Sequence, residues 1–458
     1  MNGILVSLRL LYAQSVKVLI GIRIERIKKQ MTKNEQIKES IRQTKEKRKI
    51  QVCKVYTVKF DKSHLSKDKL QFLNMLFLEA KWLYNYQIAT DNIFNFDYKI
   101  KEVEAKDKEG NKVIKELKYL SSQMRQALIE RTKRNVLALS KLKKTGNKIG
   151  KLKFKSRIYS IPLKQYNITY KIQNKNYIKL QGYKTNFKVI GLKQIPKEVS
   201  IANANLIKRA GNFYLKIICF IPKEERIKTG KMIGLDFGIK DNITDSNGVK
   251  INFQFPETKQ LKKLSHKLHK AKLGSKNREK LKLKLEKQYE LIDNKKKEAK
   301  NQFIHKLIKE NDLIAIQDEN LKGWMSSRMN GFGRVVQHSI MGGIISDLKH
   351  KSETIMIPKY YPSTQLCYCG ARNKINLNDR IYHCDNCGIT EDRDIHSAKM
   401  ILLEGIRISM EHRNTMPVEE KPLCAETTNQ HTSFSGEAGS YDALAHGSSH
   451  NGYYVKYK

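Results

Sequence analysis

Two short apolar runs, each leading into acidic residues, constrain this chain more than any other feature. The run MIGL leads into Asp236, and the later run DLIAI leads into Gln317-Asp318-Glu319. Runs of this length and composition are typical of buried strands. An acidic side chain in such a strand is costly to bury unless it is paired or binds a metal ion. The two runs therefore predict buried strands that carry acidic groups to a metal site.

The segments around these runs predict the order of the remaining elements. NITDSNGVKINF predicts a hairpin that turns at Asn247-Gly248, and residues 257–310 predict two long lysine-rich helices broken near Gly274-Ser275. A last amphipathic helix begins at Asp394. Strand, hairpin, helices, strand and a final helix with an aspartate is the order of an RNase-H-like fold. In that arrangement the first and fourth strands lie side by side, and the last helix places its carboxylate between them.

Three carboxylates spread in this way suit a phosphodiesterase site with two Mg²⁺ ions, because several anionic oxygens must meet to hold the pair. The candidates are Asp236, Glu319 and Asp394. Asp318 is the alternative to Glu319, which is longer and lies nearer the carboxyl end of its strand, where active sites of open sheets lie. Asp392 is the alternative to Asp394, although an acid there also suits the positive start of the helix.

Four cysteines precede the last helix, and each pair is followed by a glycine. They are Cys367, Cys369, Cys384 and Cys387, with Gly370 and Gly388. Few cysteines in a long chain, clustered in this way, indicate a metal site in a reducing compartment rather than a disulfide scaffold. Four thiolates suit tetrahedral Zn²⁺. The first pair has the spacing CxC, one residue shorter than the usual CxxC, so a weakened site is the alternative.

The charge of the chain indicates a polyanionic partner. It carries 89 Lys+Arg against 45 Asp+Glu, a formal net charge of +44. The basic stretch KKTGNKIGKLKFKSR also contains glycines, which let a backbone approach a phosphate closely. The candidate nucleic-acid contacts are Lys148, Lys151, Lys153, Lys155, Arg157 and, further along, Arg334. The alternatives are solvated lysines on an ordinary β-domain and, for Arg334, local helix polarity.

The N-terminal half predicts a helical block and a small antiparallel barrel. VCKVYTVKF predicts a strand, and two long helices with the charged loop KEVEAKDKEGNKVIKE between them extend to about residue 142. Short alternating segments then follow to about residue 229. Charges interrupt the apolar start of the chain, so we expect no membrane span and no secretory signal, and a cytoplasmic, nucleoid-associated protein. Met31 is an alternative start to Met1, and the tail from Pro417 predicts disorder.

From about Lys54 to Met416 the chain resembles the TnpB (OrfB) family of insertion-sequence proteins, relatives of the type V CRISPR effectors. The resemblance lies in GNKIGKLKFKSRIYSIPLKQ, IGLDFGIKDNITDSNG, LIAIQDENLKGW, GRVVQHSIMGGIISDLK, YYPSTQLCYCG, YHCDNCG, DRDIHSA and, more weakly, HRNTM. It departs from the family in the CxC pair, in the N-terminal extension and in His396, where the family usually has Asn.

The resemblance implies an α+β multidomain fold. A helical recognition domain is inserted in a wedge β-barrel, and an RNase-H-like (RuvC) α/β nuclease domain with an inserted zinc ribbon follows. The implied parts are a basic N-terminal extension 1–50, a first wedge strand 51–62, a helical recognition domain 63–145, the wedge barrel 146–230, a RuvC-like nuclease with helical hairpin 231–365, the zinc ribbon 366–388, the final RuvC helix 389–416 and a disordered tail 417–458.

The resemblance also implies RNA-guided cleavage of double-stranded DNA. A guide RNA derived from the transposon end pairs with the target strand after the protein reads a short adjacent motif. Position by position, the RuvC acids fall on Asp236, Glu319 and Asp394, which would hold two Mg²⁺, and the Zn²⁺ ligands fall on the four cysteines. The alternatives are a nuclease-inactive RNA-guided repressor and a transposase accessory or DDE-like transferase that acts on the element ends.

Overall fold

The computed structural model describes residues 32–90, 92–107, 110–224, 226–326, 332–376 and 379–415. The choice between Met1 and Met31 and the expected disordered tail 417–458 lie outside these ranges. The described residues divide into two compact units, residues 32–224 and residues 226–415. Every helix in the described ranges is too short or too polar to cross a lipid bilayer.

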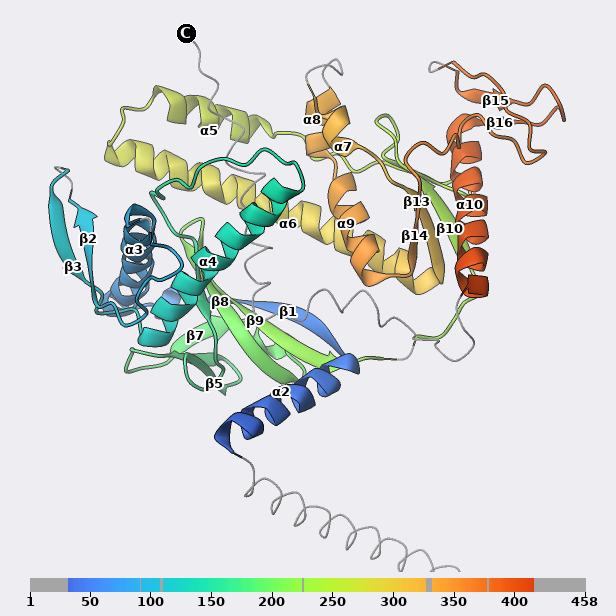
Figure 1. The fold of residues 1–458 in the computed structure, drawn as a ribbon. Coiled ribbons are helices and arrows are strands. Elements are labelled where there is room, and N and C mark those ends of the chain that lie inside the picture. The colour runs from blue at the N-terminus through green and yellow to red at the C-terminus, as the bar shows by residue number, and fades with distance from the viewer. Residues whose placement is uncertain are drawn as a thin grey trace, which may run out of the picture. The chain divides into compact units, whose positions relative to one another are not determined.

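A seven-stranded antiparallel sheet forms the centre of the first unit, in the order β4-β8-β9-β1-β7-β6-β5 (Figure 1). The strands are β1 (Gln51–Phe60), β4 (Ser160–Leu163), β5 (Tyr170–Asn174), β6 (Tyr177–Leu180), β7 (Phe187–Ile190), β8 (Ser200–Arg209) and β9 (Asn212–Pro222). The hydroxyl of Tyr170, on the β5 edge, donates a hydrogen bond to the carbonyl of Ala202 on β8 (2.7 Å). The sheet therefore curls into a nearly closed barrel, which agrees with the predicted short alternating strands.

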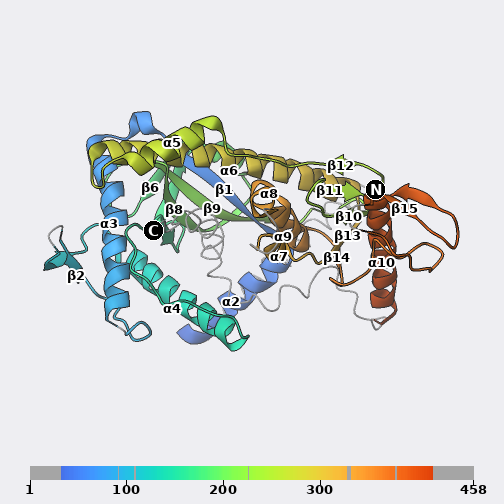
Figure 2. The ribbon, with the colours of Figure 1, turned by 90° about the horizontal axis from the view of Figure 1, so that it is seen from above.

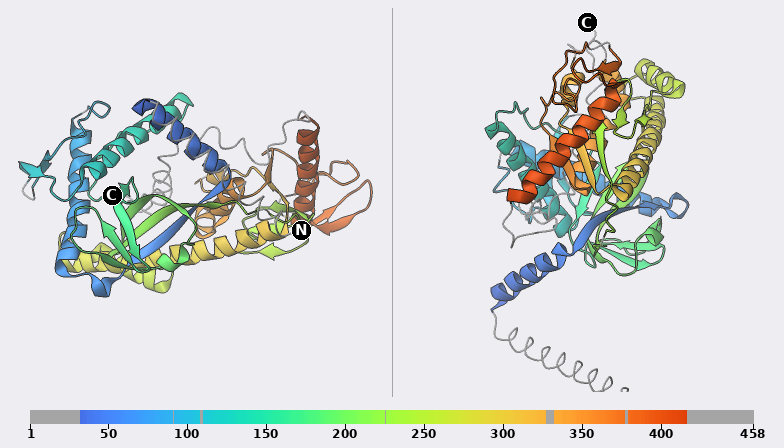
Figure 3. Two further views of the ribbon diagram at one scale, coloured as in Figure 1. Left: turned by 90° about the horizontal axis from the view of Figure 1, so that it is seen from below. Right: turned by 90° about the vertical axis from the view of Figure 1, so that its right-hand side faces the viewer.

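The helices of this unit are α2 (Lys33–Lys49), α3 (Lys67–Ala89) and α4 (Ser122–Lys144), with short 3-10 turns η1 (Lys62–His64) and η2 (Leu192–Gln194). Each of the three helices begins at a Ser or Thr whose side chain accepts a backbone N–H of the first turn. The α3 face expected in the core is buried, with Leu73, Leu76, Ala80 and Leu83 all inaccessible to solvent. Helix α2 leads directly into β1 and buries none of its residues (Figure 3).

The expected charged loop between α3 and α4 is a β-hairpin, so that prediction was wrong. Strands β2 (Glu102–Lys106) and β3 (Lys112–Glu116) pair in antiparallel register. Val103 is buried while its neighbours in β2 are exposed, so the segment follows the period of two that a half-buried strand requires. The ion pair between Lys112 and Glu104 (2.8 Å) crosses the hairpin. High charge concealed this alternation in the sequence.

A five-stranded sheet forms the centre of the second unit, in the order β12-β11-β10-β13-β14. Its strands are β10 (Met232–Asp236), β11 (Ile243–Asp245), β12 (Lys250–Ile251), β13 (Leu313–Gln317) and β14 (Thr354–Ile357). Strand β10 pairs in parallel with β13, which pairs in parallel with β14, while β11 runs antiparallel to β10. The predicted neighbourhood of the two acidic strands is therefore confirmed.

The helices of this unit are α5 (Lys259–Lys270), α6 (Lys276–Glu310), α7 (Leu321–Trp324), α8 (Phe332–His338), α9 (Met341–Lys351) and α10 (Arg393–Thr415), and a small hairpin of β15 (Ile381–His383) and β16 (Thr390–Asp392) precedes α10. Helix α10 packs directly on the strands that carry the acids (Figures 1 and 2). Glycines allow this approach, because a Cβ at Gly405 would lie 2.5 Å from the Cβ of Ala315 on β13. The packing fixes the start of α10 at one edge of the sheet.

Candidate metal and nucleic-acid sites

Three elements place the predicted carboxylates at one edge of the second sheet. Asp236 is the last residue of β10, and Glu319 follows β13 by two residues. Because β10 and β13 are parallel, both acids lie at the carboxyl ends of adjacent strands. Asp394 lies in the first turn of α10, which packs across the same strands.

The electrostatics of Asp236 show that the three carboxylates interact. Protein atoms surround this side chain closely although it keeps some access to solvent. Desolvation, followed by the charges of Asp394 and Glu319, raises the pKa of Asp236 to about 8. A hydrogen bond with Ser397 and the charge of Arg393 oppose this rise only partly. Burial beside two further carboxylates therefore disfavours the charged form of Asp236, and a bound cation would offset this cost.

The neighbouring acids have other partners. Asp318 is exposed and pairs with Lys349 at 3.2 Å. Asp392 accepts the backbone N–H groups of Asp394 (3.0 Å) and Ile395 (3.2 Å), which is the capping role that an acid at a helix start fulfils. Both alternatives therefore have structural contacts of their own. The catalytic assignment itself remains a prediction.

Cations on three elements hold Asp394 in place. The guanidinium groups of Arg393 and Arg380 lie 3.3 and 3.7 Å from its carboxylate, and the ammonium of Lys250 lies 3.9 Å away. Lys250 also pairs with Asp392 at 2.7 Å. The first turn of α10 is therefore tied to the β12 strand and to the β15 hairpin. The positioning role of these cations was not predicted from the sequence.

A buried polar network extends from Asp236 into the loop after β14. Ser397, whose hydroxyl neighbours Asp236, donates to the hydroxyl of Ser363 (2.9 Å), and Ser363 donates to Oε1 of Gln317 (3.1 Å). The side-chain amide of Gln317 donates in turn to backbone carbonyls of the loop at residues 358–361. The side chains of this network lie in segments that carry the family resemblance. Polar residues beside apolar ones in these segments were the sequence feature that could have predicted the network.

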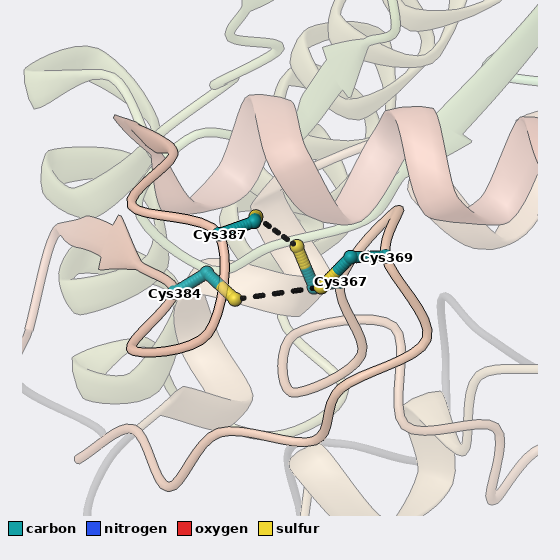
Figure 4. Close-up of side chains that lie close together, drawn as sticks. All are labelled: Cys367, Cys369, Cys384 and Cys387. Carbon is teal, nitrogen blue, oxygen red and sulfur yellow. Dashed lines mark hydrogen bonds between the residues drawn. The ribbon is translucent and has the colours of Figure 1, made fainter.

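The four predicted cysteines form one compact cluster, with all ligand atoms within 4.8 Å of one another (Figure 4). The Sγ atoms of Cys367 and Cys387 are 3.5 Å apart, and those of Cys369 and Cys384 are 3.7 Å apart. Zn–S bonds of about 2.3 Å in a tetrahedron separate the sulfurs by about 3.8 Å, so the cluster has the dimensions of a Zn²⁺ site.

The short first pair does not prevent this arrangement. After each pair, a glycine at positive φ donates its N–H back to the first cysteine: Gly370 to Cys367 (3.0 Å) and Gly388 to Cys384 (2.8 Å). A backbone hydrogen bond from Cys387 lowers the pKa of Cys384, whereas hydrogen bonds from the other three thiols raise the pKa of Cys387, so the four thiols titrate as one group. The cluster could therefore bind zinc despite the CxC spacing.

His396 connects this cluster to α10. It is buried, and its ring stacks on Tyr382 with the centroids 3.5 Å apart. Nδ1 lies 2.7 Å from Oε1 of Glu391, and Nε2 lies 2.6 Å from the carbonyl of Leu366. An asparagine could not fill this stack, so the departure from the family residue at this position has a structural role.

The basic residues predicted to contact nucleic acid are in two places. Five of them lie in the loop between α4 and β4 and are exposed: Lys148, Lys151, Lys153, Lys155 and Arg157. Side chains of α3 hold this loop, since Asn85 accepts the N–H of Lys155 (2.8 Å) and donates to its carbonyl (3.0 Å), while Tyr84 donates to the carbonyl of Lys153 (3.3 Å). Arg334 is exposed on α8 in the second unit. The loop is thus a pre-positioned basic surface.

Comparison with known proteins gives two family matches in the parts that hold these sites. Residues 216–328, with Asp236 and Glu319, match the OrfB_IS605 family, described as "Probable transposase", and residues 348–401, with Asp394 and the four cysteines, match the Cas12f1-like TNB domain. The resemblance to the TnpB (OrfB) family is confirmed. Proteins similar to this chain are therefore described as transposases and as RNA-guided nucleases.

Curated relatives support the same resemblance. The chain is 28% identical over 212 residues to "Putative RNA-guided DNA endonuclease" of Streptomyces pristinaespiralis, a match that covers 44% of this chain and 52% of the relative. It is 26% identical over 220 residues to the TnpB-like protein L79 of Acanthamoeba polyphaga mimivirus, covering 42% and 41%. The chain thus spans about half the length of these relatives. Among solved structures, a Cas12f1–sgRNA–target DNA complex aligns with a TM-score of 0.38 at 14% identity, covering 61% of this chain and 70% of that one.

Proposed function

We propose that this chain is a TnpB-like RNA-guided DNA endonuclease that hydrolyses target DNA beside a short adjacent motif. The observation that carries the proposal is the position of Asp236, Glu319 and Asp394 at one sheet edge, where burial, followed by the charges of the other two acids, raises the pKa of Asp236 to about 8. A folded protein retains such an arrangement of like charges mainly where a cation or a reaction uses it. The family resemblance supports the nuclease over other metal enzymes.

The donor set suits Mg²⁺, which prefers carboxylate oxygens and retains several waters. Asp236, Glu319 and Asp394 would hold two ions. When bound, they would supply an activated water and stabilise the leaving 3′ oxygen of the scissile phosphodiester. The protein positions its ligands in advance, because Ser397 holds Asp236 while Arg393, Arg380 and Lys250 hold Asp394. Asp236 would give up its proton as an ion binds, so binding would strengthen with rising pH.

The partners in this proposal are a guide RNA derived from the transposon end and a double-stranded DNA target. Base pairing would carry the sequence specificity, and the protein would hold the heteroduplex through its backbone. The exposed loop with Lys148, Lys151 and Lys153 supplies phosphate contacts, and a Zn²⁺ ion in the cysteine cluster would hold the ribbon against α10. The basic composition, with a net charge of +44, supports a polyanionic partner of this size.

The test begins with the protein purified together with the RNA that it retains, which is sequenced. The preparation then receives Mg²⁺ and a plasmid library with a guide-matched target and randomised flanks. We expect cutting beside a common motif, and loss of cutting in Asp236→Ala, Glu319→Ala and Asp394→Ala. The matched control is Asp318→Ala, because this acid is next to Glu319 but pairs with Lys349.

The other outcomes separate the competing functions. Retained RNA and target binding without cutting in the parent would indicate the nuclease-inactive repressor. Absence of RNA, with strand transfer at element ends, would indicate a DDE-like transferase. Loss of cutting in Asp318→Ala with retention in Glu319→Ala would overturn the choice of ligand.

A further inference from the structure

The turn after β14 carries an exposed aromatic side chain that takes no part in the sites described above. The backbone N–H of Tyr361 donates to the carbonyl of Pro358 (3.0 Å), which places Lys359 and Tyr360 at the tip of a tight turn. Tyr360 is 86% exposed, so its ring contributes almost nothing to the packing of the unit. Its closest described partner is Lys359, whose ammonium lies 5.0 Å from the ring centroid. The ring and the ammonium together form a small amphipathic surface.

The backbone of this turn, in contrast, is firmly held. The amide group of Gln317, which is only 7% exposed, donates to the carbonyls of Tyr361 (2.8 Å) and Lys359 (3.1 Å). Ser363 completes the hydrogen bonding of Gln317 by donating to its Oε1. A buried amide committed to one turn fixes that turn, since an unpaired amide would be costly to bury. The structure therefore combines a rigid backbone with an exposed ring, as a preorganised binding contact requires.

The turn also lies beside the acidic site. Strand β14 runs parallel to β13, so the turn leaves the sheet at the same edge as Glu319. The charge of Lys359 acts on Glu319 and opposes the rise of its pKa. The network through Gln317, Ser363 and Ser397 connects the turn to Asp236. Lys359 is thus close enough to Glu319 to act on its charge, and Tyr360 is the next residue of the same turn.

We propose that Lys359 and Tyr360 bind the single DNA strand that enters the acidic site, Tyr360 by stacking on a base and Lys359 by pairing with a phosphate. The proposal deepens the nuclease function above and rests on it. An exposed tyrosine ring stacks on an unpaired base, because the faces of paired bases are occupied by their neighbours in the duplex. The bound base would fix the strand, and the phosphate beside it would lie near Asp236 and Glu319.

The first test measures strand binding without cleavage. A DNA oligonucleotide that contains 2-aminopurine is titrated into the full-length, RNA-loaded protein in Ca²⁺. We expect quenching of the 2-aminopurine fluorescence by the parent and by Tyr360→Phe. In Tyr360→Leu the quenching should be lost and the affinity should fall roughly 5- to 100-fold. Tyr177→Leu, a partly exposed tyrosine of the first unit, should leave both unchanged.

The second test separates the phosphate contact from the stacking contact. Lys359→Gln should lower the slope of log affinity against log salt by about 0.7, the amount expected for one phosphate on a single strand. Lys349→Gln is the matched control, because Lys349 pairs with the exposed Asp318. With Mg²⁺ and a guide-matched target, Tyr360→Leu should cut at least about tenfold more slowly than Tyr360→Phe.

The outcomes distinguish this inference from the nuclease proposal. A parent that cuts, with Tyr360→Leu cutting and quenching equally well, would overturn the inference alone. Equal loss in Tyr360→Phe and Tyr360→Leu would overturn stacking, because the phenylalanine retains the ring. A parent that binds the strand with ring-dependent quenching but does not cut would support the contact and overturn the nuclease. Unchanged melting temperatures in all variants would exclude misfolding as the cause.

Discussion

Replacing Gly234 by alanine should separate the final helix from the acidic strand. Gly234 lies in β10, two residues before Asp236, and faces α10. A Cβ at this position would lie 2.8 Å from the backbone N of Leu402 and 2.9 Å from its Cβ, and closer still to the carbonyl of Ala398. Two of these atoms belong to the helix backbone, so no side-chain rotation can relieve the overlap. The helix must move away from the sheet by about 1 Å to restore normal contact.

This displacement has two consequences of different size. Overpacking in a tightly packed interface destabilises by about 1–3 kcal/mol, and the backbone overlap favours the upper end of that range. For a unit of this size, about 3 kcal/mol lowers the melting temperature by roughly 6–12 °C. The shift also moves Asp394 away from Asp236, and a misplacement of about 1 Å at a catalytic site slows a reaction about 100-fold.

Differential scanning calorimetry, hydrogen exchange of α10 and the guide-directed cutting rate measure these effects. Gly342→Ala is the matched control, because its Cβ would meet only the flexible end of Leu321 at 3.4 Å. Helix α9 should gain about 0.5–1 kcal/mol from that change. If Gly234→Ala retains the parent's melting temperature and cutting rate, α10 does not pack over β10 in the way described.

Three further predictions concern charge, zinc and the basic loop. In EDTA, Asp236→Asn should have a larger free energy of unfolding than the parent at pH 7. The parent's Asp236 loses its proton near pH 3.8 in the unfolded chain and near pH 8 in the folded chain, so the parent loses stability as the pH rises from 3.8 to 8. Chemical denaturation measures both proteins, and a stability difference that does not widen from pH 4 to pH 8 would contradict this prediction. Cys387→Ser should lose the bound zinc in mass spectrometry of metals, while Cys53→Ser, outside the cluster, should retain it. Asn85→Ala removes a hydrogen bond from the backbone of Lys155, so it should speed hydrogen exchange there and weaken RNA binding severalfold. The slope of log affinity against log salt should stay unchanged, because the basic charges remain. A reduced slope would assign Asn85 a different role.

The local sequence determined most of the elements that build the acidic site. Alternation and apolar runs located β10 and β13, because a strand buried on both faces must be apolar along its length. The order of hairpin, helices and final helix then predicted that β10 and β13 are neighbours, which the parallel pairing confirmed. Cysteine spacing with the two glycines predicted the compact sulfur cluster. The β2–β3 hairpin escaped prediction, because its period of two is carried mostly by charged residues.

Only the tertiary structure decided which polar side chains work together. It pairs Asp318 with Lys349, a contact that the sequence did not predict. It joined Gln317 to the turn that carries Tyr360, and it placed Asn85 against the backbone of Lys155. Each of these contacts unites residues that are distant in sequence. Apolar periodicity is a property of a single segment and can be read along the chain, whereas a buried hydrogen bond depends on the position of a partner that another segment supplies.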